Sequence, residues 1–375
     1  MGIKMKKILF LLLVLAAAGV GYWAFLYQTP EEKNFIRALN AAKEGNVAAQ
    51  LQTADFYAAG TGTKQDGKQA VYWYRQAALE GDPDALWKCA QAYTEGKLVP
   101  QDLEEAVPFL MLGAKQGNIP AQEELSRFYA QGLGGLVKHE GESLYWQFIA
   151  AKIGSSSAQA ALKQAQQHSP QLYESVEKFL TDLKTAQEGD GSARLAVGEA
   201  YLTGNPILQN TEEAEKWLTL AWQENKLSQA GLMLAQAYQN GPLSDAAKAN
   251  RMWNELAKQA YAPAQYALGE KAYQSGHYDD AFAWFSNAAA GGFAQGQYMT
   301  GFMLMQGQGT AVSVPLAVTF FRSAAEQENV PAQYVLGQIY WKGLGVPQDK
   351  KVGKMWLEKA AMRGNKEAQT LLESE

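Results

Sequence analysis

The chain has 375 residues, of which 47% are hydrophobic and 19% are charged. This composition excludes a largely disordered chain, and the length favours several domains or a repeat array over one compact core. The formal net charge is −5 at pH 7 and no run of basic residues occurs, so nucleic acid is not expected as a partner. Alanine and glutamine are abundant and proline is scarce, which favours helices.

Residues 1–30 form the first predicted element. Lys4, Lys6 and Lys7 precede an uncharged apolar run over residues 8–27. Twenty helical residues span about 30 Å, the thickness of a bilayer core, so we predict one transmembrane anchor with the lysines in the cytoplasm. The alternative is a signal peptide cleaved after Ala16–Ala18, which would leave a soluble periplasmic or secreted protein. The run is longer than the apolar part of a typical signal peptide, which favours the anchor.

Several features indicate a bacterial exported protein. The start "MKKILFLLLVLAAAG" is typical of bacteria, and no Asn-x-Ser/Thr glycosylation sequence occurs. Cys89 is the single cysteine, so an intrachain disulfide is excluded. We therefore expect a single-pass protein of the inner membrane whose remaining residues face the periplasm.

One glycine-rich stretch occurs twice. The segment "GTGTKQDGKQAVYWYRQAALEGD" at residues 60–82 returns as "GLGVPQDKKVGKMWLEKAAMRGN" at residues 343–365. The shared residues are glycines, an aspartate, a tryptophan and two alanines, whereas Lys64 is replaced by Pro347. The stretch is therefore a structural repeat and not a phosphate-binding loop, which would need its lysine.

The first glycine of this stretch recurs along the chain at intervals of 31 to 37 residues, with one gap of 72. Such periods are typical of stacked helix pairs. The recurring glycines are Gly60, Gly96, Gly132, Gly204, Gly241, Gly276, Gly307 and Gly343.

Each repeat predicts two helices. In the last one, Ala332, Leu336 and Tyr340 form a core-facing stripe on the first helix, and Gly343 ends that helix in the left-handed conformation. Asp349 is the predicted N-cap of the second helix. Three other repeats predict capping boxes, namely Asp66 with Gln69, Asp102 with Glu105, and Asn210 with Glu213.

The last repeat, "PAQYVLGQIYWKGLGVPQDKKVGKMWLEKAAMRGN", resembles the Sel-one-like repeat family, a relative of the tetratricopeptide repeats. The resemblance covers nearly all of residues 46–364 and implies an all-α, right-handed superhelical solenoid of about nine antiparallel helix pairs. The unit over residues 261–292 departs from the pattern and resembles a tetratricopeptide repeat at Gly269, Gly276, Tyr278, Ala281 and Ala288.

We divide the chain into four segments. Residues 1–30 are the anchor or signal peptide, and residues 31–154 are a cap helix and three repeats. The 72-residue gap places a degenerate helix pair at residues 155–190, with Ser169 and Pro170 opening its second helix and a kink or boundary expected there. Residues 191–375 are five repeats and a C-terminal cap helix.

Catalytic chemistry finds no support in the residue patterns. His139, His168 and His277 lie in three different units, without a ligand partner at a recognised metal-binding spacing, and are expected to be solvated loop residues. Cys89 lies on a predicted core stripe and is expected to be a buried, inert thiol. We therefore expect no enzyme, no catalytic residue, no metal and no cofactor.

A binding surface is predicted where large residues occupy positions that the repeat does not require. The candidates are Trp341, Trp222, Phe302, Met303 and Met305. The alternative is that these residues only pack against their neighbours, since buried aromatic residues outnumber binding ones.

The predicted function is protein binding. Resemblance to the family implies two specific roles. One is an immunity protein that sequesters a secreted antibacterial toxin. The other is a scaffold or regulator for envelope assembly or signalling complexes.

Overall fold

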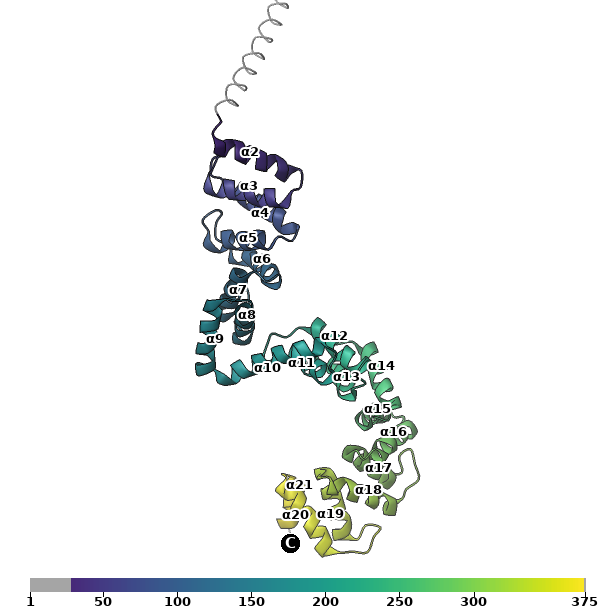
Figure 1. The fold of residues 1–375 in the computed structure, drawn as a ribbon. Coiled ribbons are helices and arrows are strands. Elements are labelled where there is room, and N and C mark those ends of the chain that lie inside the picture. The colour runs from purple at the N-terminus through teal and green to yellow at the C-terminus, as the bar shows by residue number, and fades with distance from the viewer. Residues whose placement is uncertain (1–27, 374–375) are drawn as a thin grey trace, which may run out of the picture. The chain divides into compact units, whose positions relative to one another are not determined.

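The computed structural model describes residues 28–373, and this part of the chain contains 20 helices and no strand (Figure 1). The apolar run predicted as an anchor, residues 8–27, lies outside the described residues. Within residues 28–373, none of the helices combines the length and the apolar character that crossing a membrane requires. The helices are α2 (Pro30–Lys43), α3 (Val47–Ala59), α4 (Gly67–Leu79), α5 (Pro83–Glu95), α6 (Leu103–Lys115), α7 (Ile119–Gln131), α8 (Glu140–Lys152), α9 (Ser156–His168), α10 (Pro170–Gln187), α11 (Gly191–Thr203), α12 (Thr211–Gln223), α13 (Ser228–Asn240), α14 (Ala246–Lys258), α15 (Ala262–Gln274), α16 (Tyr278–Ala290), α17 (Ala294–Gln306), α18 (Val314–Glu326), α19 (Val330–Lys342), α20 (Lys350–Met362) and α21 (Lys366–Glu373).

Sixteen of these helices form eight consecutive pairs. Each paired helix is 13 residues long and, except for α11, packs against the helices before and after it in the chain; α11 packs against α12. The pairs are α3–α4, α5–α6, α7–α8, α11–α12, α13–α14, α15–α16, α17–α18 and α19–α20, while α2 and α21 cover the two ends. The all-α solenoid predicted from the repeat is thus confirmed, and its right-handed course stays a prediction.

Seven of the eight repeat glycines lie in the left-handed region at the end of the first helix of a pair as predicted, although Ser275 is the C-cap of α15 and Gly276 follows it. Gly60 has φ +72° and Gly343 has φ +69°, in the left-handed region where a side chain is disfavoured. Gly241 is the exception, because it has φ −108° and lies in the extended region.

The N-caps are also as predicted, but the capping boxes are not. The Asp66 carboxylate accepts the Gln69 N–H at 3.0 Å, whereas the Asp66 N–H donates to the carbonyl of Tyr57 at 2.9 Å. In the next repeat the Asp102 N–H donates to the carbonyl of Tyr93 in the same way. Because the repeat tyrosine carbonyl already takes the N–H of the N-cap residue, the return bond of a capping box has no donor. Only α2 has a complete box among the described helices.

Alanines and large aromatic residues form the core between successive pairs. Trp73, Phe321 and Trp356 are buried among alanines that let neighbouring helices approach closely. Cys89 is fully buried in the same way, and burial raises the pKa of its thiol to about 12. The expectation of a buried core thiol is confirmed, and its inertness stays a prediction.

The described chain divides into two compact units. The first contains the residues up to Thr181 together with the loop Gly204–Leu208, and the second contains residues 182–203 and 209 onward. The loop is held in the first unit by Glu142, whose carboxylate accepts the Leu208 N–H at 3.0 Å. Gly141 is required beside it, because a Cβ there would lie 1.7 Å from the carbonyl oxygen of Pro206.

Residues 155–190 hold two helices, but these are not packed as a pair. Ser169 alone joins α9 to α10, without a left-handed glycine to reverse the chain, and the two helices meet at an angle (Figure 1). The apolar side chains of α10 join a cluster with those of α8 and the end of α9, in which the ring centroids of Phe148 and Tyr173 are 4.9 Å apart. The structure therefore has eight helix pairs where about nine were expected.

Candidate functional site

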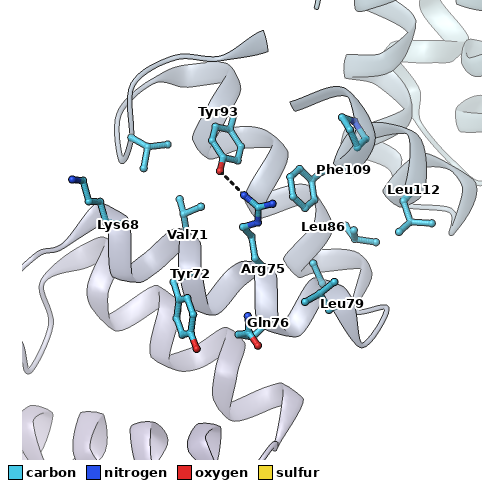
Figure 2. A pocket seen from close by; sticks show the side chains of 13 residues that line it. Lys68, Val71, Tyr72, Arg75, Gln76, Leu79, Leu86, Tyr93, Phe109 and Leu112 are labelled. Atoms are coloured by element: carbon cyan, nitrogen blue, oxygen red, sulfur yellow. Dashed lines mark hydrogen bonds between the residues drawn. The ribbon is translucent and has the colours of Figure 1, made fainter. Parts of the chain in front are cut away.

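The first unit contains a hollow of about 580 Å³ formed by α4, α5 and α6 (Figure 2). We call it the α4–α6 groove. It is lined by Lys68, Val71, Tyr72, Arg75, Gln76, Ala78, Leu79, Leu86, Tyr93, Val99, Pro108, Phe109 and Leu112.

Three large apolar side chains on the rim of this groove are open to solvent. Tyr72 is 51% exposed, Leu79 is 78% exposed and Leu112 is 45% exposed. Tyr72 and Leu79 are seven residues apart on α4 and so share one face of that helix, while Tyr74 and Ala77 on its other face are buried in the core. Covering such a side chain on binding contributes about 1.5–3 kcal/mol, which makes the rim a favourable contact surface.

Arg75 is held at the wall of the groove by three neighbours. Its Nη1 donates to the Tyr93 hydroxyl at 3.2 Å, and its Cζ lies 5.5 Å from the centroid of the Phe109 ring, which stacks on Tyr93 (Figure 2). Glu105 lies outside the lining and approaches Nη1 at 3.9 Å. The guanidinium is thus oriented while its side chain stays 49% exposed.

The charged residues that line the groove, Lys68 and Arg75, are both basic. Although the whole chain is acidic, this hollow therefore favours an acidic group beside an apolar one.

Two of the predicted binding residues fill space inside the solenoid. Trp222 is partly buried between two core clusters, and a Cβ on Gly231 would lie only 2.7 Å from its ring. Trp341 packs against the C-terminal core cluster, and the Lys350 ammonium lies 5.3 Å from its ring centroid. This is the arrangement expected if these residues only pack against neighbours.

The remaining candidates lie in the core around α17. Met303 is 0% exposed and packs with Ala281 and Phe285, so it presents no surface to a partner, which corrects its assignment as a contact residue. Phe302 and Met305 are partly buried against the neighbouring cluster. None of the five predicted residues lines the α4–α6 groove.

A sequence signal for the groove exists at the end of the second helix of each pair. Leu79 is the last residue of α4, and the equivalent residue is polar in five other pairs. These residues are Lys115, Lys152, Gln223, Lys258 and Glu326. Trp341 was selected by comparing the positions that follow the repeat tyrosine. Those positions do not indicate that α4 has an exposed apolar residue at its end.

The histidines and acids form no metal site within residues 28–373, where no group of three or more His, Cys, Asp or Glu side chains could hold a metal ion. His139 lies in the loop before α8, as expected, but it is only partly exposed. It is the N-cap of α8, its Nδ1 accepts the Glu142 N–H at 3.0 Å, and burial lowers its pKa.

The geometry is that of a helical-repeat binding protein, with an open hollow on a stack of helix pairs. The Sel1 repeat family model matches seven segments, which together cover more than half of the chain, so the chain belongs to the Sel1 repeat family. The segments are residues 47–82, 83–118, 119–155, 191–223, 262–293, 294–329 and 330–365. The unit expected to depart towards a tetratricopeptide repeat, residues 261–292, is thus matched as a Sel1 repeat.

Two solved structures are similar to this chain. One is a protective antigen present in uropathogenic Escherichia coli strains that displays an SLR fold, with 26% identity, 90% of this chain and 82% of that chain covered, and a TM-score of 0.39. The other is a Sel1 repeat protein from Oxalobacter formigenes, with 26% identity, 90% of each chain covered and a TM-score of 0.47.

Proposed function

We propose that this protein binds a protein partner in the α4–α6 groove and carries out no catalysis. The observation that carries the proposal is the convergence of exposed Tyr72, Leu79 and Leu112 on one hollow beside the oriented Arg75. The partner supplies a large apolar side chain that enters the hollow and an acidic side chain that pairs with the guanidinium. Arginine and aromatic residues around a desolvated pocket are the usual composition of an energetic centre in an interface.

We further propose that the binding unit is tethered to the bacterial inner membrane and faces the periplasm. Support comes from the sequence, where Lys4, Lys6 and Lys7 precede the apolar run of residues 8–27. A fusion of a reporter enzyme to Glu375 tests this proposal. A reporter that functions only in the periplasm is expected to be active, and the fusion protein is expected to sediment with membranes. A soluble fusion protein that lacks residues 8–27 would indicate a cleaved signal peptide instead.

Within this setting we propose that the protein is an immunity protein that sequesters a secreted antibacterial toxin. Concentration of the exposed apolar side chains on one hollow favours a single, tightly bound partner over many weak ones. The alternative, a scaffold or regulator for envelope assembly or signalling complexes, is favoured by one observation, a second hollow in the other unit.

The test is capture of partners from the native cell with the tagged full-length chain, compared with two single substitutions. Leu79→Lys introduces a charged side chain into the groove. Three other repeats have a lysine at the equivalent position, namely Lys115, Lys152 and Lys258, so we expect the fold to be kept. Met362→Lys is the matched control, because Met362 is the last residue of α20, is 84% exposed and lies outside the groove.

We expect the partner to be lost with Leu79→Lys and retained with Met362→Lys. A single stoichiometric toxin, together with growth that is impaired only when that toxin is present, supports the immunity role. Several envelope proteins, captured more weakly, support the scaffold. Equal capture by both variants would exclude the groove as the binding site.

A further inference from the structure

The last repeat differs in charge from the rest of the chain. Residues 342–366 contain seven basic and two acidic residues, whereas the whole chain has a net charge of −5. Helix α20 carries four of the seven basic residues and packs against α19 and α21 (Figure 1). The basic residues are Lys342, Lys350, Lys351, Lys354, Lys359, Arg363 and Lys366.

Helix α20 has one buried face and one exposed face. Trp356, Leu357 and Ala360 are buried in the clusters that this helix shares with its neighbours. Met355 and Met362 lie on the opposite face and are 41% and 84% exposed. They are seven residues apart and so share this face, where their flexible side chains can adapt to an irregular apolar surface.

Lysines surround the two methionines on the exposed face of α20. Lys351 lies one turn before Met355, Lys354 directly precedes it, and Lys359 lies one turn after it. The Lys351 ammonium is exposed and forms no ion pair with any residue that the structure describes. Glu358 is the single acid of this face, and its carboxylate is 3.9 Å from the Lys354 ammonium. The face is therefore positive as well as apolar.

The form of these charges indicates what they bind. In the α4–α6 groove the Arg75 guanidinium is oriented by Tyr93 and Phe109, as a specific partner requires. The lysines of α20 instead carry point charges on long, flexible side chains, which suit the mobile phosphates of lipid headgroups. Lysine stems lie along apolar surface while their ammonium groups stay in water, so the methionines between them can enter the boundary between headgroups and acyl chains.

We infer that the exposed face of α20 binds the surface of an anionic phospholipid bilayer. Met355 and Met362 insert at the level of the headgroups, and the three lysines contact lipid phosphates. The methionines are about 10 Å apart along the helix axis, so the helix lies parallel to the membrane plane when both insert. No residue that lines the α4–α6 groove lies on α20, so the two surfaces are separate.

The test is recruitment of the full-length chain to vesicles, measured by flotation. The chain is held in nanodiscs of phosphatidylcholine, which keep the apolar run of residues 8–27 out of the vesicles. We expect recruitment to vesicles of phosphatidylethanolamine and phosphatidylglycerol, none to vesicles of phosphatidylcholine alone, and loss of recruitment as added salt screens the charges. Absence of recruitment, or equal recruitment to both kinds of vesicle, would overturn the proposal.

Substitutions on α20 identify the face that binds. The combination of Lys351→Gln, Lys354→Gln and Lys359→Gln is expected to weaken vesicle binding about a hundredfold, at about fivefold for each lysine. Met355→Ser combined with Met362→Ser is expected to weaken it about tenfold, because less apolar surface is inserted. All five side chains are exposed, so the fold is kept. Unchanged binding in both variants would overturn the assignment to α20.

The matched control removes three exposed lysines from the first unit. Lys64→Gln, Lys138→Gln and Lys163→Gln together change the net charge equally and are expected to leave vesicle binding unchanged. An equal loss in this control would show that net charge alone decides binding and would overturn the proposal. Tighter binding to polyglutamate than to vesicles would assign the face to an acidic protein instead.

The lipid-binding face and the α4–α6 groove can be tested separately. Leu79→Lys changes the groove and leaves vesicle binding intact, because Leu79 lies on α4. Met362→Lys alters lipid contact without altering the capture of a partner, because Met362 lies outside the groove. Failure of this proposal and failure of the proposed function are therefore distinguishable.

Discussion

The Arg75 guanidinium donates to the Tyr93 hydroxyl at 3.2 Å, and Arg322 donates to Tyr340 in the same way near the other end of the chain. The arginine stands on the second helix of one pair and the tyrosine on the first helix of the next. Tyr93 and Tyr340 are partly buried, and their hydroxyls link successive helix pairs. Tyr340 was predicted as a core-facing aromatic residue, and its ring does pack against the core cluster while its hydroxyl contacts Arg322.

This arrangement separates the contributions of ring and hydroxyl in Tyr340. Tyr340→Phe keeps the ring and is expected to cost about 0.5–1.5 kcal/mol or less, as for one exposed hydrogen bond. Tyr340→Ala also removes the packed ring and is expected to cost about 1.5–3 kcal/mol. Urea unfolding of the three proteins measures both values. Equal destabilisation by the two substitutions would mean that the ring contributes nothing to the core.

The repeat itself was predictable because its signals are local. A left-handed glycine such as Gly343, an N-cap such as Asp349 and a helical apolar stripe each act within a few residues of the chain. The groove was not predicted, because the exposure of Tyr72 and Leu112 depends on the packing of three successive helices. The junction of α9 and α10 at Ser169 and Pro170 was predicted, but the failure of these helices to pack as a pair was not, since it depends on the contacts of α10 with α8.

Trp222 and Gly231 show the same limit of prediction from the sequence. Trp222 occupies a position that other repeats fill with a small residue, which suggested a binding surface. The structure accommodates its ring through Gly231 on the following helix. Comparing single positions between repeats does not reveal a compensation that lies nine residues away.

Gly231→Ala tests this packing directly. The added Cβ would lie 2.7 Å from Trp222 Cε3 and 3.0 Å from Leu256 Cδ2, closer than van der Waals contact. We expect destabilisation of about 1–3 kcal/mol by overpacking, measured as a lower midpoint of thermal unfolding. The double variant Gly231→Ala, Trp222→Ala should be less destabilised than the sum of its two single substitutions, since the closer of the two contacts, that with Trp222, is gone. Strict additivity would show that the two residues do not interact.

Glu142 gives stability a predictable dependence on pH. Burial raises the pKa of its carboxyl above the ordinary value of 4.5, and the Leu208 N–H bond acts in the opposite direction. Because the folded-state pKa is the higher one, the folded state binds this proton more tightly. The resulting stabilisation is present at low pH and is lost as the pH rises through the folded-state pKa.

Glu142→Gln keeps an acceptor for Leu208 without a titrating charge. We expect its thermal midpoint to exceed that of the unsubstituted protein at neutral pH and this advantage to shrink as the pH falls towards 4.5. His139 contributes with the opposite sign, because burial lowers its pKa, but it is present in both proteins and cancels in the comparison. Tyr129 and Tyr145, whose pKa values are raised by burial, titrate above this range. A difference between the two proteins that does not vary with pH would contradict the buried ionised carboxylate.

Arg75→Lys tests whether the oriented guanidinium, and not only a positive charge, is needed in the α4–α6 groove. Lysine keeps the charge but cannot reproduce the planar fork that contacts Tyr93 and lies beside Phe109. Because Arg75 is half exposed, the free energy of unfolding should change by about 1 kcal/mol or less. Partner affinity, measured by calorimetry once the partner has been captured, should fall about tenfold to a hundredfold, the range for loss of a central interface residue.

Lys248→Arg in the second unit is the control for a lysine–arginine exchange outside the groove and should leave affinity unchanged. Wild-type affinity in Arg75→Lys would reduce the role of this residue to general charge attraction, and the apolar rim of Tyr72, Leu79 and Leu112 would then have to account for the specificity of the groove.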